Sequence, residues 1–206
     1  VGGAIATNAG GSRVVRFGTM RQQLVGVEAV LADGSVVGSL AGLAKETVGL
    51  HWPSLLAGSE GTLAVVTAAR LRLVPHFDQI TTALVAFDDL DAALALLATA
   101  RRRLRSLDSI EIIWPEALDL VTAHLGTTAP IDLPTGGVAV VIECADHTDP
   151  STDLLEVLAD VDGVATTAIA TDGPRRQHLL SFRDRITEAI AAAATAASTP
   201  TYKLDV

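Results

Sequence analysis

The chain has 206 residues, of which 49% are hydrophobic, so it is long enough for one large or two small domains with a buried core. Its formal net charge of -9 would repel a phosphate backbone, which argues against general nucleic-acid binding. No run of residues reaches the roughly 18 consecutive apolar positions of a membrane span, so we expect no transmembrane segment.

The first part of the chain contains two glycine-rich segments. We expect a tight turn at Gly2-Gly3 and the following Thr7-Asn8-Ala9-Gly10-Gly11, and a second at Gly58-Ser59-Glu60-Gly61-Thr62-Leu63. Amide donors and short polar side chains at such turns can converge on the anionic oxygens of a cofactor. Either segment alone is equally well explained as an ordinary tight turn.

Between these turns the sequence predicts a small β-rich unit. An apolar run over 24–31, the pair Asp33-Gly34 and the pair Val36-Val37 predict a hairpin. A short helix over 50–57 and two β-rich stretches over 62–67 and 69–74 follow, and Pro75 ends the unit.

Beyond Pro75 the pattern alternates between strand and helix. Strands are expected over 81–87, 110–113, 138–144 and 164–170, and helices over 91–105, 115–125 and 151–159. The order β-α-β, an extra helix and again β-α-β predicts a ferredoxin-like α+β layer over 77–170. A long helix over 174–197 and a final strand complete the chain.

The lone cysteine, Cys144, lies in an apolar strand pattern and cannot form an internal disulfide, so we expect an inert core thiol. This composition fits a reducing compartment, and we expect a cytoplasmic location. The sequence leaves the oligomeric state open, with a homodimer among the alternatives.

Several kinds of site are disfavoured by spacing. A zinc site needs clustered ligands, whereas the histidines are scattered at His51, His76, His124, His147 and His178. The turn at Gly58 lacks the Gly-x-Ser-x-Gly spacing of a hydrolase elbow, and neither glycine segment has a Walker A or dinucleotide pattern. A nucleotide-type pyrophosphate must therefore be held in another way.

Four motifs in order carry a resemblance to a known family: Val1-Gly2-Gly3-Ala4-Ile5-Ala6-Thr7-Asn8-Ala9-Gly10-Gly11, Arg16-Phe17-Gly18, Val27-Glu28-Ala29-Val30-Leu31-Ala32-Asp33-Gly34 and Gly58-Ser59-Glu60-Gly61-Thr62-Leu63. The chain resembles the FAD-linked oxidases related to vanillyl-alcohol oxidase, and most closely the D-lactate, glycolate and D-2-hydroxyglutarate dehydrogenases. The resemblance implies an α+β fold: the C-terminal part of a flavin-binding domain over 1–76, followed by a ferredoxin-like substrate or cap domain, truncated, over 77–206.

The resemblance also implies FAD as the cofactor. The residues that would bind FAD come from both glycine segments and are Gly2, Gly3, Thr7, Asn8, Ala9, Gly10, Glu60, Gly61, Thr62, Leu63, Val65 and Val66. Small residues would admit the flavin edge, and amides or hydroxyls would bond its oxygens. The alternative is that Leu63, Val65 and Val66 are only strand core.

For the substrate, the resemblance implies a carboxylate-anchoring set of Arg183, Thr187 and Lys203. Arg183 and Thr187 are four residues apart, which places them on one face of a continuous helix. The alternative is an Arg183 ion pair with Asp184 or Glu188 and an exposed Lys203.

The sequence departs from the family in places. Ala64 replaces a common glycine, and Leu50-His51 replaces a common Tyr-Asp pair. We expect the chain to be an excerpt of a longer polypeptide that is inactive alone, because an upstream glycine loop and a downstream histidine segment are missing. No catalytic residue is therefore assigned, and a divalent metal would enter only through segments outside this chain.

The leading hypothesis is part of an FAD-dependent enzyme that oxidises a small D-2-hydroxy acid of the lactate, glycolate or 2-hydroxyglutarate type, with an unidentified electron acceptor. The alternative from another class is a non-catalytic ferredoxin-like interaction module that retains a remnant of the flavin domain. A third option, the uridine-nucleotide reductase branch of the same flavin fold, is disfavoured by the Arg183, Thr187 and Lys203 arrangement.

Overall fold

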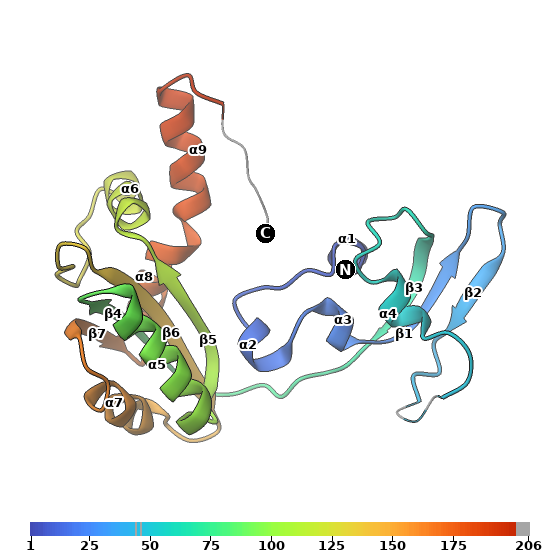
Figure 1. The fold of residues 1–206 in the computed structure, drawn as a ribbon, viewed down its shortest axis with the longest axis horizontal. Helices are drawn as coiled ribbons and strands as arrows, with labels where there is room; N and C mark the ends of the chain where they lie inside the picture. Colours follow the sequence, from blue (N-terminus) through green and yellow to red (C-terminus); the bar gives the residue numbers. More distant parts are fainter. Residues whose placement is uncertain (44, 46, 201–206) are drawn as a thin grey trace. The chain divides into compact units, whose positions relative to one another are not determined.

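The computed structural model describes residues 1–43, 45 and 47–200, and the chain forms two compact units, Val1–His76 and Phe77–Val206 (Figure 1). The boundary coincides with the division expected near Pro75. Among the described residues, no helix combines the length and the apolar character needed to cross a bilayer.

The first unit is built on a three-stranded antiparallel sheet in the order β2-β1-β3. Ile5, Val27 and Leu56 are fully or almost fully buried and form its core. Its elements are α1 (Gly2–Ala6), α2 (Val14–Phe17), α3 (Met20–Gln23), β1 (Leu24–Val30), β2 (Val36–Ser39), α4 (Trp52–Leu56) and β3 (Val65–Leu71).

The predicted hairpin is confirmed, since Val30 pairs with Val36 in the β1–β2 ladder. Gly34 has φ +86° at the turn, a conformation that costs glycine little. The predicted helix over 50–57 is confirmed as the shorter α4, which begins after His51: the ring Nδ1 of His51 accepts a hydrogen bond of 3.3 Å from the amide of Ser54.

Two expectations for this unit are wrong. The stretches 62–67 and 69–74 contribute to one strand, β3 (Val65–Leu71), which runs on through residue 68. Thr67 is an extra residue in this strand: Ala29 pairs with Val66, but Glu28 pairs with Ala68. The Thr67 hydroxyl donates to the Glu28 carbonyl at 3.1 Å, so this bulge lets a single strand continue where the sequence alternation slips. Gly2 and Gly3 lie in helix α1 rather than in a turn.

The second unit has the predicted ferredoxin-like topology. Its four-stranded sheet has the order β5-β6-β4-β7, and all neighbouring strands are antiparallel. Its elements are β4 (Gln79–Phe87), α5 (Leu90–Arg103), β5 (Leu107–Ile113), α6 (Pro115–Leu125), β6 (Val138–Asp146), α7 (Ser151–Ala159), β7 (Val164–Ala170), α8 (Gly173–Asp184) and α9 (Ile186–Ala196).

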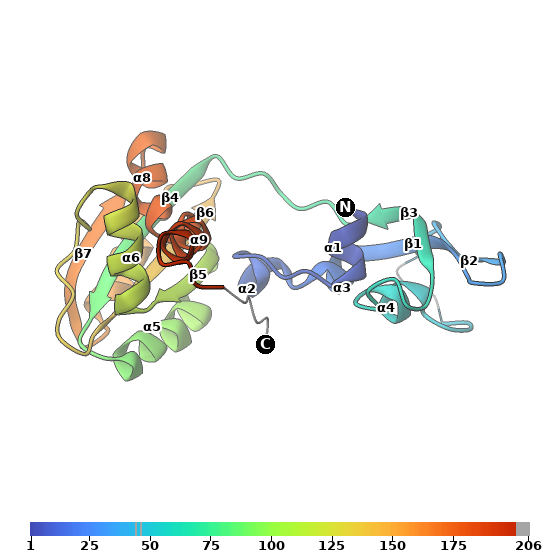
Figure 2. The same ribbon diagram turned by 90° about the horizontal axis from the view of Figure 1, so that it is seen from above.

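Helices cover both faces of this sheet: α5 and α7 pack together on one face (Figure 1), and α6 and α9 lie side by side (Figure 2). On the other face, Leu84 of β4 and Val141 of β6 pack in one cluster with residues of α6 and α8, including Leu179 and Phe182. Side chains alternate between the two faces along each strand, so β4 and β6 are buried along nearly their whole length.

The expected single helix over 174–197 is wrong because it breaks at Arg185. That residue has φ -96° and ψ 2° and separates α8 from α9. Leu179 and Phe182 hold α8 on the sheet, whereas α9 packs on α6, and the break allows both contacts. The expected final strand at 202–206 lies outside the described residues.

Candidate functional site

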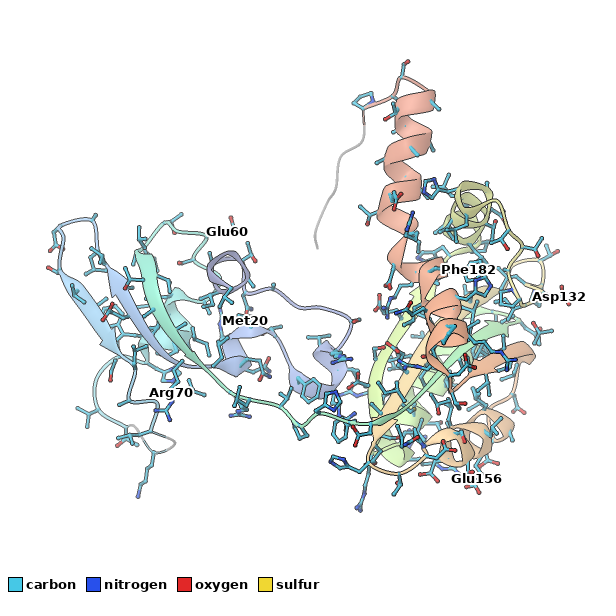
Figure 3. All side chains as sticks on the ribbon, turned by 180° about the vertical axis from the view of Figure 1, so that it is seen from behind. Met20, Glu60, Arg70, Asp132, Glu156 and Phe182 are labelled. Atoms are coloured by element: carbon cyan, nitrogen blue, oxygen red, sulfur yellow. The ribbon has the colours of Figure 1, made fainter. Side chains whose placement is uncertain are left out.

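The two glycine segments of the first unit are hydrogen-bonded to each other. The Gly58 amide donates to the Ile5 carbonyl at 3.0 Å, and the Glu60 amide donates to the Ala6 carbonyl at 2.8 Å. The two segments therefore lie side by side, as a single cofactor site that draws residues from both requires. Figure 3 shows Glu60, with its exposed side chain, in the loop beside α1.

A polar link through Arg21 ties the same two segments together. The amide of Arg21 donates to Asn8 Oδ1 at 2.9 Å, and its Nη2 donates to the Ala57 carbonyl at 2.7 Å. A Cβ added to Gly58 would stand 3.1 Å from Asn8 Cβ and 3.2 Å from Arg21 Nη2. Glycine at position 58 is thus what allows this close approach.

Of the three non-glycine residues with positive φ in the described part of the chain, two lie in these segments. Asn8 has φ 50° and Glu60 has φ 51°, and Gly58 and Gly61 have φ 85° and 76°. Non-glycine residues adopt this region at a cost, and such residues cluster at ligand-binding sites. The strained positions therefore mark this surface as the candidate cofactor site.

Most backbone amides of the two segments are used inside the protein. The amides of Thr7, Asn8, Ala9, Gly58, Ser59, Glu60 and Thr62 all donate to carbonyls of the same unit. The expected convergence of many amides on an anion is therefore wrong for these positions. In the described part of the chain, the amides of Gly10, Gly61 and Leu63 make no such hydrogen bond and remain available as donors.

The hydroxyls at the site are also engaged as donors. Thr7 Oγ1 donates to the Gly3 carbonyl at 3.0 Å, and Thr62 Oγ1 donates to the Ser59 carbonyl at 2.6 Å. Each oxygen keeps lone pairs that can accept a hydrogen bond. Both residues thus fix the bends and present acceptors rather than donors.

The apolar residues that follow the second segment differ in exposure. Leu63 is 49% exposed and Val65 is 69% exposed, whereas Val66 packs against the core of the unit. The strand-core alternative is therefore right for Val66 and wrong for Leu63 and Val65. Two exposed apolar side chains beside free amides suit a planar, partly apolar ligand.

In the second unit, the predicted substrate residue Arg183 lies in a network of charged groups. Its Nε and Nη2 contact Asp184 Oδ1 at 2.8 and 2.7 Å. Its Nη1 lies 3.4 Å from Glu111 Oε1 and 3.8 Å from Glu143 Oε2. The alternative of an Arg183–Asp184 ion pair is thus correct as a contact, and Glu188 pairs with Arg185 instead.

Glu143 is the buried centre of this network, with only 6% of its surface exposed. Its Oε1 accepts from Thr82 Oγ1 at 3.1 Å and from Arg176 Nη2 at 3.2 Å, and its Oε2 accepts from Ser109 Oγ at 3.3 Å. A buried carboxylate is tolerated when it is paired and hydrogen-bonded in this way.

The other two predicted substrate residues do not join the network. Thr187 is exposed in the first turn of α9, beyond the break at Arg185, so it does not share a continuous helix with Arg183. Lys203 lies outside the described residues.

Sequence reasoning missed Glu143, Arg176, Thr82 and Ser109. A signal for Glu143 was present, because it is the one charged residue inside the apolar run Val138–Ala145. A charge in a buried strand requires a partner of opposite charge, which predicts an arginine or lysine above it. The identity of that arginine follows only from the register of α8 on the sheet.

The chain matches two family models. Residues 78–206 match the model described as FAD linked oxidases, C-terminal domain, and residues 1–39 match an FAD binding domain.

Sequence relatives point the same way. The chain is 34% identical over 197 residues to the mitochondrial D-2-hydroxyglutarate dehydrogenase of Bos taurus, and the match covers 92% of this chain and 36% of the relative. It is 31% identical over 190 residues to the D-lactate dehydrogenase of Archaeoglobus fulgidus, covering 92% of this chain and 42% of the relative. The chain thus spans less than half the length of these relatives.

Among solved structures, an alkyldihydroxyacetonephosphate synthase aligns with a TM-score of 0.59 at 17% identity, covering 89% of this chain and 36% of that chain. At this level of identity the likeness concerns the fold.

Proposed function

Because the chain belongs to the FAD-linked oxidase family, we propose that the whole protein oxidises a small D-2-hydroxy acid to the 2-oxo acid with FAD as the acceptor. The observation that carries the proposal is the joined pair of glycine segments, with Gly58 bonded to Ile5 and Glu60 bonded to Ala6. Together with the FAD binding domain match over 1–39, this surface supports FAD as the cofactor.

The residues at the two bends fit a flavin in three respects. The free amides of Gly10, Gly61 and Leu63 can donate to flavin or phosphate oxygens, and a Cβ at Gly61 would meet no atom within 4 Å, so the space beside it is open. The exposed side chains of Leu63 and Val65 offer an apolar surface for the ring system. We propose that the rest of the expected set shapes this surface: Gly2, Gly3, Thr7, Asn8, Ala9, Glu60, Thr62 and Val66.

Bound FAD supplies an acceptor for the hydride that leaves the substrate Cα. Arg183, Thr187 and Lys203 orient the substrate carboxylate, with Arg183 presenting the planar edge of its guanidinium. The base that takes the hydroxyl proton is a histidine outside these residues, so no residue of this chain is assigned that role. Lactate, glycolate and 2-hydroxyglutarate remain equal candidates for the substrate.

The same proposal extends to the electron acceptor, the oligomeric state and the location of the protein. An unidentified acceptor would take the electrons from FAD, and a homodimer is one alternative for the oligomeric state. From the composition we propose a cytoplasmic location; the bovine relative is named as mitochondrial, so the mitochondrion is the competing location. Cell fractionation and sedimentation of the full-length protein test the location and the oligomeric state.

The test of the proposed function is anaerobic flavin reduction in the full-length protein. We expect the purified protein to carry FAD, and its oxidised-flavin absorbance to disappear on addition of D-lactate, glycolate or D-2-hydroxyglutarate but not of L-lactate or L-2-hydroxyglutarate. A well-folded protein that binds no flavin, or that binds flavin and responds to none of these acids, would instead favour the non-catalytic module.

A further inference from the structure

We infer that Glu143 is a positioning residue for substrate anchoring: its buried carboxylate, clamped by Thr82, Ser109 and Arg176, fixes the guanidinium of Arg183. This inference rests on the proposed role of Arg183 in binding the substrate carboxylate.

The sheet register places Glu143 between two hydroxyl residues. Glu143 of β6 pairs directly with Thr82 of β4 and with Ser109 of β5. Directly paired residues of neighbouring strands project to the same face of a sheet, so the three side chains form one row across three strands. Both hydroxyls donate to the carboxylate, which is therefore held on the face that α8 covers.

Helix α8 brings two arginines to this row. Arg176 and Arg183 are seven residues apart, which places them two turns apart on the same face of the helix. Leu179 and Phe182 of α8 are 4% and 0% exposed and anchor this face to the core. Arg176 also donates from Nε to Thr82 Oγ1 at 3.1 Å, so it holds both Glu143 and the hydroxyl that binds Glu143.

The carboxylates around Arg183 fall into two groups by exposure. The side chains of Asp184 and Glu111 are 54% and 39% exposed, whereas that of Glu143 is 8% exposed. Exposed ion pairs are weak and exchange readily with water, so a substrate carboxylate can displace Asp184. Glu143 cannot move aside without breaking its bonds to Thr82, Ser109 and Arg176.

The contacts also divide the guanidinium into two edges. Asp184 occupies the Nε and Nη2 edge, and Glu143 and Glu111 lie at Nη1. The Nε and Nη2 edge is one that receives a carboxylate in a bidentate pair. The substrate would thus replace Asp184 on this edge while Glu143 holds the opposite nitrogen in place.

The experiment compares Glu143→Gln with the wild type in the full-length, FAD-loaded protein. Glutamine keeps the size of the side chain and one acceptor oxygen but removes the charge that fixes Arg183. We expect KM for the D-2-hydroxy acid to rise about tenfold while kcat changes by less than about threefold, since carboxylate binding is weakened. Calorimetry of the 2-oxo acid product should show its dissociation constant raised by a similar factor.

Glu156→Gln is the matched control, because Glu156 is an exposed glutamate of α7, on the other face of the sheet. This change should leave KM and the product dissociation constant as in the wild type. If Glu143→Gln does not fold, Thr82→Val replaces it, since valine keeps the shape and removes the hydroxyl shared by Glu143 and Arg176. Thr82→Val should raise KM by about threefold, because it removes the hydrogen bonds that the hydroxyl makes with Glu143 and Arg176 but leaves the charge of Glu143 in place.

The outcomes separate this inference from the proposed function. A wild type that reduces no flavin with any D-2-hydroxy acid would overturn both. If the wild type is active and Arg183→Met raises KM, but Glu143→Gln or Thr82→Val changes only the amount of folded enzyme and leaves KM and product affinity unaltered, the role of Glu143 is structural and the inference alone fails.

Discussion

Gly58 is a residue at which an added side chain would meet the other bend of the first unit, and it sets the first prediction. Gly58→Ala places a methyl group 3.1 Å from Asn8 Cβ and forces alanine to adopt φ +85°. We expect this change to lower the free energy of unfolding by about 2–3 kcal/mol, from backbone strain plus crowding, as measured by urea denaturation.

Gly34→Ala is the matched control for Gly58→Ala. Gly34 has nearly the same φ, +86°, but a Cβ there meets no atom within 4 Å. Gly34→Ala should therefore lower the free energy of unfolding by about 1 kcal/mol, from backbone strain alone. Equal losses for the two variants would contradict the view that the bends are held together by this close approach.

For single residues, the sequence predicted where glycines would be needed better than it predicted backbone conformations and hydrogen bonds. The glycine segments were visible because Gly58 and Gly61 stand in a recognisable order. The left-handed Asn8 and Glu60, and the amides already used inside the protein, were not visible, because they follow from hydrogen bonds across the two segments. Glu143 was visible as a charge in an apolar strand, but its partner Arg176 was not.

The β1–β2 hairpin carries a prediction about pH. In the turn of this hairpin, Asp33 accepts hydrogen bonds from the amide and the hydroxyl of Ser35. Both lower the pKa of Asp33 below its usual 3.8, and the amide has the larger effect. A carboxyl with a lowered pKa in the folded state stabilises the turn above the unfolded pKa, and this contribution is lost as the pH falls through the lowered folded pKa.

We therefore expect the amide resonance of Ser35 to shift with pH at a midpoint below 3.8, and amide exchange in the hairpin to accelerate below that midpoint. Asp33→Asn should remove the titration while keeping an acceptor for the Ser35 amide. A midpoint at or above 3.8 in the folded protein would contradict the hydrogen-bonded turn.

Elements set by local chemistry were predicted well, and elements set by packing were not. The Asp33-Gly34 pair marks the hairpin, and the alternation of apolar strands and capped helices marks the ferredoxin-like order. The bulge at Thr67 and the break at Arg185 depend on partners distant in sequence, namely Glu28 of β1 and helix α6. The sequence pattern around Thr67 therefore favoured two separate strands, and the pattern around Arg185 favoured one continuous helix.

The second unit contains a four-stranded sheet with helices on both faces and its own buried core. We expect the fragment 77–206 to fold alone and to unfold cooperatively in urea, with an m-value appropriate to its size. Limited proteolysis of the chain should cut first near Leu73, which is 92% exposed just after β3. A gradual, non-cooperative transition of the fragment would contradict its independence.

The family and the ferredoxin-like topology could be predicted from the sequence because the glycine motifs and the order of elements are both local signals. The network around Arg183 could not, since it joins β4, β5, β6 and α8 across 102 positions of sequence, from Thr82 to Asp184. It depends on strand register and on the seating of one helix, neither of which is encoded in any single segment.

If FAD lies against the joined bends, as we propose, its dissociation constant in the full-length protein should respond to one added side chain beside them. Gly61→Val and Gly34→Val impose similar strain, since the two glycines have φ +76° and +86° and each faces open space. If FAD occupies the space beside Gly61, Gly61→Val raises the dissociation constant at least about tenfold while Gly34→Val leaves it within about twofold. Equal FAD affinity in the two variants would mean that FAD does not lie beside Gly61.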